Sequence, residues 1–114
     1  MGLQISSRQS GDVTVLDLQG RATIGRSNDE LSTQLRSLIE GGARKIIVNL
    51  YGVSQVDSSG ISTIVRSFVT IRRLGGALKL CHATGHVLEV LELTRLIQTI
   101  PSFPDEAAAL ASFH

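Results

Sequence analysis

Residues 45–65 read KIIVNLYGVSQVDSSGISTIV and place a strand pattern directly before a helix pattern. The run Ile46–Leu50 is short, apolar and rich in β-branched residues, which is typical of a central strand of a parallel sheet. Residues 51–57 are expected to connect it to a helix that begins near Ser58. The inward face of that helix has helical spacing and holds Ile61, Ile64, Val65, Phe68 and Ile71. A buried strand followed by an amphipathic helix is the repeating unit of an α/β fold.

Working outward, the rest of the chain repeats this unit. Alternation predicts strands over residues 2–8, 13–18, 77–81 and 98–100, the first two joined by a tight turn at Ser10–Asp12. Further helices are expected after a capping box at Ser27 and Glu30, after Thr84, and after Pro104. We therefore predict a single α/β domain over residues 1–114. Its sheet is mostly parallel, with about five strands, an antiparallel N-terminal edge strand and about four helices.

Composition narrows the classes of function. The chain has 114 residues, a formal net charge of +1, 42% apolar and 4% aromatic residues. A near-neutral charge argues against a nucleic-acid binder, and the single cysteine, Cys81, excludes an internal disulfide and a cysteine-based zinc site. Cys81 is expected to be a buried small hydrophobe. Neither a secretory leader nor a membrane span is recognisable, so the protein is expected in the cytoplasm without membrane contact.

The segment Asp57–Gly60 is the strongest candidate site. It follows the carboxyl end of a buried strand and opens a helix, where free backbone N–H groups can hold an anion. Ser58 falls at or next to the N-cap, and a glycine in the first turn allows close backbone approach. Because Asp and Ser are also common caps for purely local reasons, an ordinary helix cap is the alternative.

Asp57-Ser58-Ser59-Gly60-Ile61, with the preceding strand and the later segment Leu74–Cys81, resembles the STAS domain and, more narrowly, the bacterial anti-sigma factor antagonists. The resemblance covers the chain from the Gly11–Gly20 strand to the Asp105–Leu110 helix. In that family, the serine after the aspartate is phosphorylated by a partner that is both serine kinase and anti-sigma factor. The resemblance implies that Ser58 is the acceptor, with Ser59 a second candidate. Asp57 would shape the loop.

The resemblance also implies a switch. The unphosphorylated form would bind the kinase and free the sigma factor, and phosphorylation would release the complex while the helix start holds the phosphate. No cofactor is implied, and a monomer or weak homodimer is expected. The segment Gly20–Arg26 lacks the acidic residue often found in the family, so its arginines would meet an acidic partner or form a solvated loop. The expected partner-binding residues are Arg21, Arg26, Asp57, Ser58, Ser59, Gly60, Ser62 and Arg66.

Two other classes of function are alternatives to this switch. A serine hydrolase needs a base near Ser58, but the segment is not G-x-S-x-G, and the histidines His82, His86 and His114 are not expected on one shared face. Neither a catalytic site nor a metal site is therefore predicted, and no nucleotide-binding motif is present. The remaining alternative is a non-switching STAS scaffold, in a stress-signalling assembly or as the cytoplasmic subunit of a lipid transporter. It would use the same exposed face of the second helix, with Ser62, Arg66 and Arg73.

Overall fold

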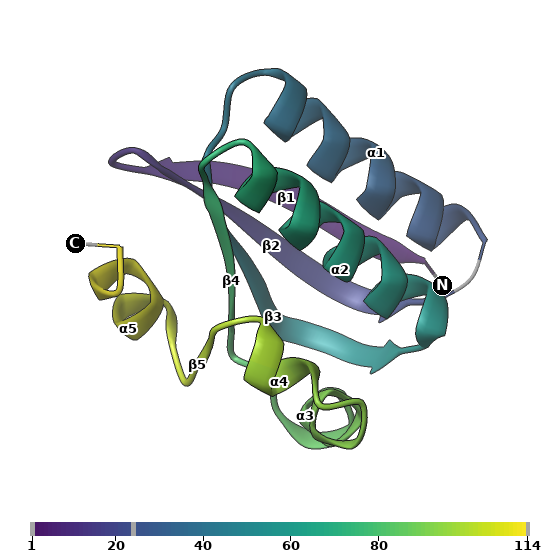
Figure 1. Cartoon of the computed structure of the whole chain (residues 1–114). Coiled ribbons are helices and arrows are strands. Elements are labelled where there is room, and N and C mark those ends of the chain that lie inside the picture. Colours follow the sequence, from purple (N-terminus) through teal and green to yellow (C-terminus); the bar gives the residue numbers. More distant parts are fainter. Residues whose placement is uncertain (1, 24, 114) are drawn as a thin grey trace.

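A computed structural model describes residues 2–23 and 25–113, with the backbone alone at Leu96 and Ile97 (Figure 1). Its elements in chain order are β1 (Leu3–Ser10), β2 (Val13–Ala22), α1 (Arg26–Glu40), β3 (Lys45–Val56), α2 (Ser58–Arg73), β4 (Ala77–Cys81), α3 (Gly85–Leu93), α4 (Leu96–Thr99), β5 (Ser102–Phe103) and α5 (Glu106–Ala111).

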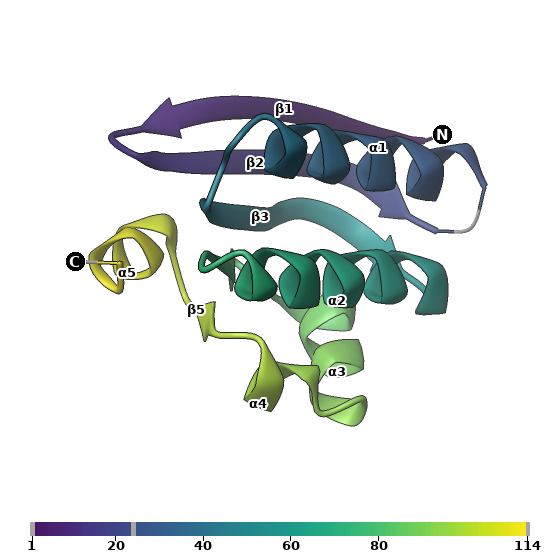
Figure 2. The ribbon, with the colours of Figure 1, turned by 45° about the horizontal axis from the view of Figure 1, so that its top comes forward.

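The strands form one sheet in the order β1-β2-β3-β4-β5. Strand β1 pairs antiparallel with β2, and the other neighbours run parallel. This confirms the predicted mixed sheet with an antiparallel N-terminal edge strand. Helices α1 and α2 lie side by side over one face of the sheet (Figures 1 and 2).

The two sheet faces carry cores of different size. The larger core lies beneath α1 and α2 and includes the fully buried Leu16, Leu35 and Ile71. On the opposite face, Ala109 of α5 packs with a small cluster that includes Cys81, which is fully buried, as expected. Burial raises the pKa of the Cys81 thiol to about 12, so this side chain acts as a small hydrophobe.

Arg8 connects strand β1 to the face of the sheet that lies opposite α1 and α2. The Arg8 Nε atom donates to Asp17 Oδ2 at 2.7 Å, and the same guanidinium forms an ion pair with Glu106 of α5. The hydrogen bond from Arg8 holds the pKa of the Asp17 carboxyl below its usual range, and Asn49 adds a second hydrogen bond to Asp17. One arginine therefore joins β1, β2 and α5.

Strand β3 is longer than the sequence pattern predicted. Residues 51–57 were expected as a connection, but β3 continues to Val56 and stays paired with β2 as far as Ala22 opposite Val56. Two register irregularities, between Asp17 and Gln19 and between Gly20 and Arg21, interrupt this second half of the ladder. They break the alternation of buried and exposed residues, which explains why the pattern did not reveal the strand.

Two local predictions were wrong. Helix α1 is preceded by Gly25 as N-cap and has no side-chain cap, so Ser27 and Glu30 lie inside the helix and form no capping box. The strand expected at residues 98–100 is replaced by α4, and β5 begins only after Pro101. There the carbonyl oxygens of Pro101 and Phe103 accept the N–H groups of Leu80 and His82.

In the described part of the chain, no helix combines the length and apolarity needed to cross a lipid bilayer.

Candidate functional site

The junction between β3 and α2 is organised by Asp57. Its backbone is extended, and its Oδ1 atom accepts hydrogen bonds from the N–H groups of Ser59, at 2.9 Å, and Gly60, at 3.2 Å. Asp57 is therefore the N-cap, and Ser58 is the first residue of the helix. Two of the amide donors that were expected to hold a phosphate are already used by this carboxylate.

Ser58 is exposed at the start of α2. The hydrogen bonds given for the described residues include none to its hydroxyl, and the capping role is taken by Asp57. Ser59 differs: it is half-buried, and its N–H is held by the cap. The more accessible of the two hydroxyls thus belongs to Ser58.

Gly60 is fixed by its contact with the end of β2. A Cβ atom at this position would lie 2.4 Å from the carbonyl oxygen of Ala22 and 3.0 Å from Val56 Cγ2. The same Ala22 oxygen accepts the N–H of Asp57 at 3.2 Å. The absence of a side chain at Gly60 therefore lets the first turn of α2 press directly on β2, which positions Ser58 relative to the sheet.

The exposed side of α2 continues from Ser58 in a row. Ser58, Ser62 and Arg66 follow one another at four-residue spacing, and all three are exposed. The neighbouring side of the helix faces α1, where Thr63 is buried and its hydroxyl lies 2.5 Å from Asn28 Oδ1. The structure thus places three of the predicted partner-binding residues on one accessible strip.

The two arginines predicted near the site lie apart from this row. Arg21 is exposed near the end of β2, where it pairs with Gln55 of β3. Arg26 is the first residue of α1 and lines a groove against Ile5 of β1. Helix α1 reaches α2 instead through Asn28, so the structure brings Arg26 to β1 and not to the row on α2.

Sequence reasoning missed a groove between α1 and α2. It has a volume of about 300 Å³, and Arg36 of α1 and Arg66 of α2 both line it. Neither arginine is in an ion pair within residues 2–23 and 25–113. The groove adds the hydroxyl residues Ser32, Ser67 and Thr70. The sequence signal for this groove lies in the exposed positions of α1, which the apolar periodicity of that helix does not describe.

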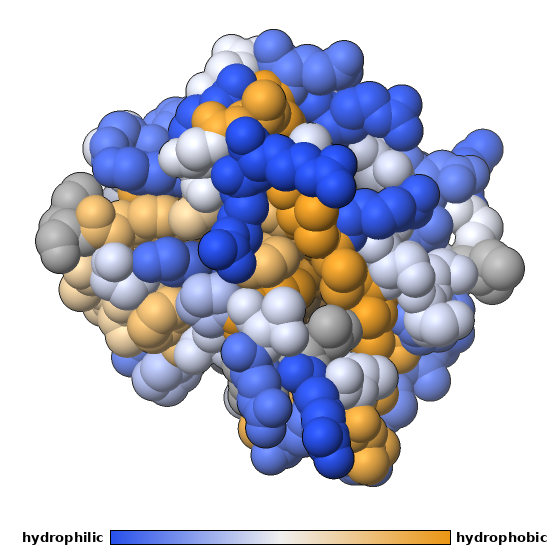
Figure 3. Space-filling view, viewed as in Figure 1, coloured by the Kyte–Doolittle hydropathy of each residue, from blue (hydrophilic) through white to orange (hydrophobic). Residues whose placement is uncertain are grey.

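An apolar band runs along α2 beside the polar row (Figure 3). Ile61 and Val65 are half-buried, and Val69 is 40% exposed. The buried side of the helix holds Ile64, Phe68 and Ile71, as predicted, while Ile61 and Val65 lie closer to its edge. An apolar strip flanked by polar side chains is a common composition for a protein-binding surface.

The cap assigns separate roles to Asp57 and Ser58, which substitution can test. Replacing Asp57 by Ala removes the acceptor for two N–H groups and is expected to cost about 1–2 kcal/mol of unfolding free energy. Replacing Ser58 by Ala should stay within about 0.5 kcal/mol of the wild type, because Ser58 is exposed. Urea unfolding of both variants measures the difference, and equal losses would contradict the assignment of Asp57 as the cap.

The histidines lie on separate elements. His82 follows β4, with its ring edge-to-face against Tyr51 at 5.4 Å, and His86 is on α3, while His114 falls outside the described residues. In the described part of the chain, no three His, Cys, Asp or Glu residues gather as a metal site.

Comparison with known proteins identifies the family. The family model of the STAS domain matches residues 4–109. An anti-sigma F factor antagonist of Paenibacillus polymyxa is 25% identical over 111 residues, covering 96% of this chain and 94% of the relative.

Two solved structures share the fold. An anti-sigma factor antagonist from Mycobacterium paratuberculosis has a TM-score of 0.87 at 15% identity, covering 97% of this chain and 93% of that one. The Bacillus cell fate determinant SpoIIAA in its phosphorylated form has a TM-score of 0.75 at 18% identity, covering 97% of this chain and 100% of that one. The chain therefore belongs to the STAS domain family, and its relative from Paenibacillus polymyxa is named an anti-sigma F factor antagonist.

Proposed function

We propose that this protein is an anti-sigma factor antagonist switched by phosphorylation of Ser58. The unmodified protein binds an anti-sigma factor that is also a serine kinase and so frees the sigma factor, and the modified protein releases that partner. The observation that carries the proposal is the separation of roles at the helix start. Asp57 provides the cap, which leaves the Ser58 hydroxyl exposed.

The phosphoryl transfer would use the kinase and its ATP. The Ser58 oxygen attacks the γ-phosphorus, the new O–P bond replaces the bond to ADP, and the hydroxyl proton leaves with a base of the kinase. This chain contributes the acceptor and its position. Because the exposed hydroxyl lies on the first residue of α2, the acceptor can reach a kinase site without unfolding of the domain.

The phosphate would act by electrostatics at the interface. It adds a charge of about −1.5 to −2 next to the Asp57 carboxylate. Two of the nearest amide donors already bind Asp57, so the helix offers limited compensation. A partner packed on this surface would have to desolvate the dianion, and a loss of about 4 kcal/mol in binding is about a thousandfold in affinity.

The row and the apolar band on α2 are the surface that we assign to the partner. Helix α2 contains three arginines, Arg66, Arg72 and Arg73, and no acidic residue. Arg72 is held over the Phe68 ring at 5.5 Å from its centroid. A partner with acidic side chains opposite these arginines and apolar side chains opposite Val65 and Val69 fits this surface.

Phosphoryl transfer tests the proposal directly. Incubation with ATP and a serine-kinase anti-sigma factor from the same genome should add about 80 Da, localised by fragmentation to Ser58. The Ser58→Ala variant should gain nothing, while Ser59→Ala should be modified like the wild type. Modification of Ser59 alone would move the acceptor by one residue. The absence of any gain with every such kinase would favour a non-switching scaffold.

A further inference from the structure

The outer edge of β1 is open along its whole length. Strand β1 pairs with β2 through all eight residues, Leu3 to Ser10, without a register irregularity. In the described part of the chain, no other strand pairs with it, and Figure 2 shows β1 at the margin of the sheet. A regular edge strand of this length presents a row of backbone donors and acceptors for another strand.

Features that normally protect such an edge are absent from β1. The strand contains no proline, no lysine and no bulge. Its one charged residue, Arg8, forms ion pairs with Asp17 of β2 and Glu106 of α5, so its charge is compensated within the same copy. The opposite edge of the sheet is protected by its shortness, because β5 has only two residues.

The hairpin geometry identifies the backbone groups that face outward. Ser10 and Val13 flank a two-residue turn with Gly11 at φ 65°. The two residues that flank such a turn form a hydrogen-bonded pair, so the backbone groups of Ser10 face β2. Hydrogen-bonded and non-hydrogen-bonded pairs then alternate along the strands. The outward N–H and C=O groups are therefore those of Leu3, Ile5, Ser7 and Gln9.

We propose that two copies of this chain pair through β1, antiparallel, to form one continuous ten-stranded sheet. With Ser6 opposite its own copy, residues 3–9 of each chain pair across a two-fold axis. Gln4 of one copy then faces Arg8 of the other, and Ile5 faces Ser7, so no like charges meet. The strand is self-complementary, which is the requirement for a two-fold interface.

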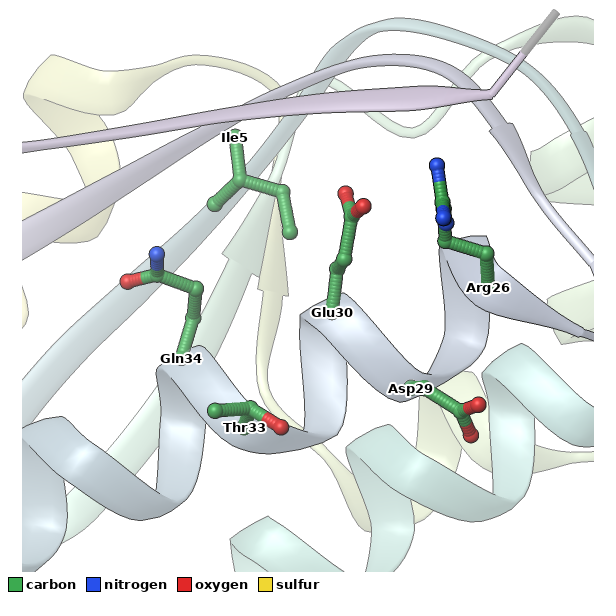
Figure 4. Close-up of a pocket in the computed structure, with 6 residues that line it drawn as sticks. All are labelled: Ile5, Arg26, Asp29, Glu30, Thr33 and Gln34. Carbon is green, nitrogen blue, oxygen red and sulfur yellow. The ribbon is translucent and has the colours of Figure 1, made fainter.

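A groove beside β1 favours a second copy of the chain as the partner of this strand. It has a volume of about 550 Å³ and lies between β1 and the first half of α1 (Figure 4). The half-buried Ile5 points from the strand toward α1, while Glu30 and Arg26 extend from the helix toward the strand. The two-fold axis of an antiparallel strand pair is perpendicular to the sheet. The grooves of the two copies therefore lie on the same face and on either side of the axis, and Ser7 of the other copy lies opposite Ile5 on that face.

The geometry also sets the strength and the consequence of the dimer. One strand pair with small central side chains buries less than the roughly 1,200 Å² of a stable interface, so the dimer is weak and depends on concentration. In the joined sheet, α1 and α2 of both copies lie over the same face. Ser58 of one copy and Ser58 of the other are therefore exposed on the same side of the dimer. The pairing does not require phosphorylation of Ser58.

Sedimentation of the purified protein from about 10 µM to about 1 mM tests the pairing, since weak dimers form in that range. The weight-average mass should rise from one copy toward two. Ser7→Pro removes an outward N–H that the ladder with β2 does not use, and it should remain monomeric at every concentration. The matched Ser7→Ala variant keeps the N–H and should dimerise like the wild type.

The folded state is checked by circular dichroism. Should Ser7→Pro unfold, Ser7→Lys replaces it, because a lysine on an edge strand opposes pairing while it leaves the backbone intact. A wild-type mass that stays at one copy up to about 1 mM would overturn the proposal. Dimerisation of the folded Pro or Lys variant with unchanged affinity would overturn it as well.

Discussion

Phosphorylation of Ser58 is expected to weaken binding of the anti-sigma factor by about a thousandfold. The physical reason is the burial of a dianion next to Asp57, where two of the nearby amide donors are already hydrogen-bonded to the cap. A carboxylate carries about half of that charge, so Ser58→Asp should lose about 2 kcal/mol, or about 30-fold. Isothermal titration of the unmodified, phosphorylated and substituted proteins against the same partner measures the series.

Ser58→Asn is the matched control for that series. Asn has nearly the shape of Asp without its charge, so it separates the electrostatic effect from steric interference. Its affinity should stay close to that of the wild type. Equal losses for Asp and Asn would show that size at position 58 controls binding, and would contradict the electrostatic switch. Ser58→Ala should bind normally and fail to release the partner when ATP is added.

Gly60→Val is expected to be the most destabilising single substitution at the site. Its Cβ would be only 2.4 Å from the Ala22 carbonyl oxygen, which is backbone and cannot rotate away. Overpacking of this kind costs about 3 kcal/mol, which lowers the melting temperature of a domain of this size by about 10 °C or more. Calorimetry or thermal circular dichroism gives the value.

Ser62→Val is the control for Gly60→Val. It puts the same β-branched side chain half a turn further along α2 at an exposed position, so it measures the helix propensity of valine without the clash. Its unfolding free energy should stay within about 0.5 kcal/mol of the wild type. A Gly60→Val variant as stable as this control would mean that α2 can move away from β2 at little cost.

The sequence predicted the parts of this fold that depend on hydrophobic periodicity. The runs Ile46–Leu50 and Ala77–Cys81 and the helix after Asp57 are strong local patterns, and their alternation predicts a parallel sheet. The far half of β3 was missed because its pairing with β2 is irregular, so burial no longer alternates. The pairing partner, which the local pattern does not contain, determines that this segment is a strand.

The location of the site could be predicted from the sequence, but the roles of its residues could not. Asp57-Ser58-Ser59-Gly60 could be located from its residues, but local propensity allows either Asp57 or Ser58 to cap the helix. The backbone at Asp57 decides between them, because its N–H is fixed by Ala22 of β2. The side of α1 that faces β1 was likewise not evident from Arg26, because the start of that helix depends on Gly25 and not on a side-chain cap.

The cap at Asp57 also affects how readily a phosphatase would remove a phosphate from Ser58. A phosphate hydrogen-bonded to the amides at the helix start would be shielded from a phosphatase, and those hydrogen bonds would have to break before hydrolysis. Here the carboxylate of Asp57 takes the amides of Ser59 and Gly60, so the phosphate would stand in solvent, repelled by its neighbour. Under the proposed switch, the phosphate would add little to the stability of the folded state, and the phosphorylated fraction of Ser58 would be set by the relative rates of kinase and phosphatase.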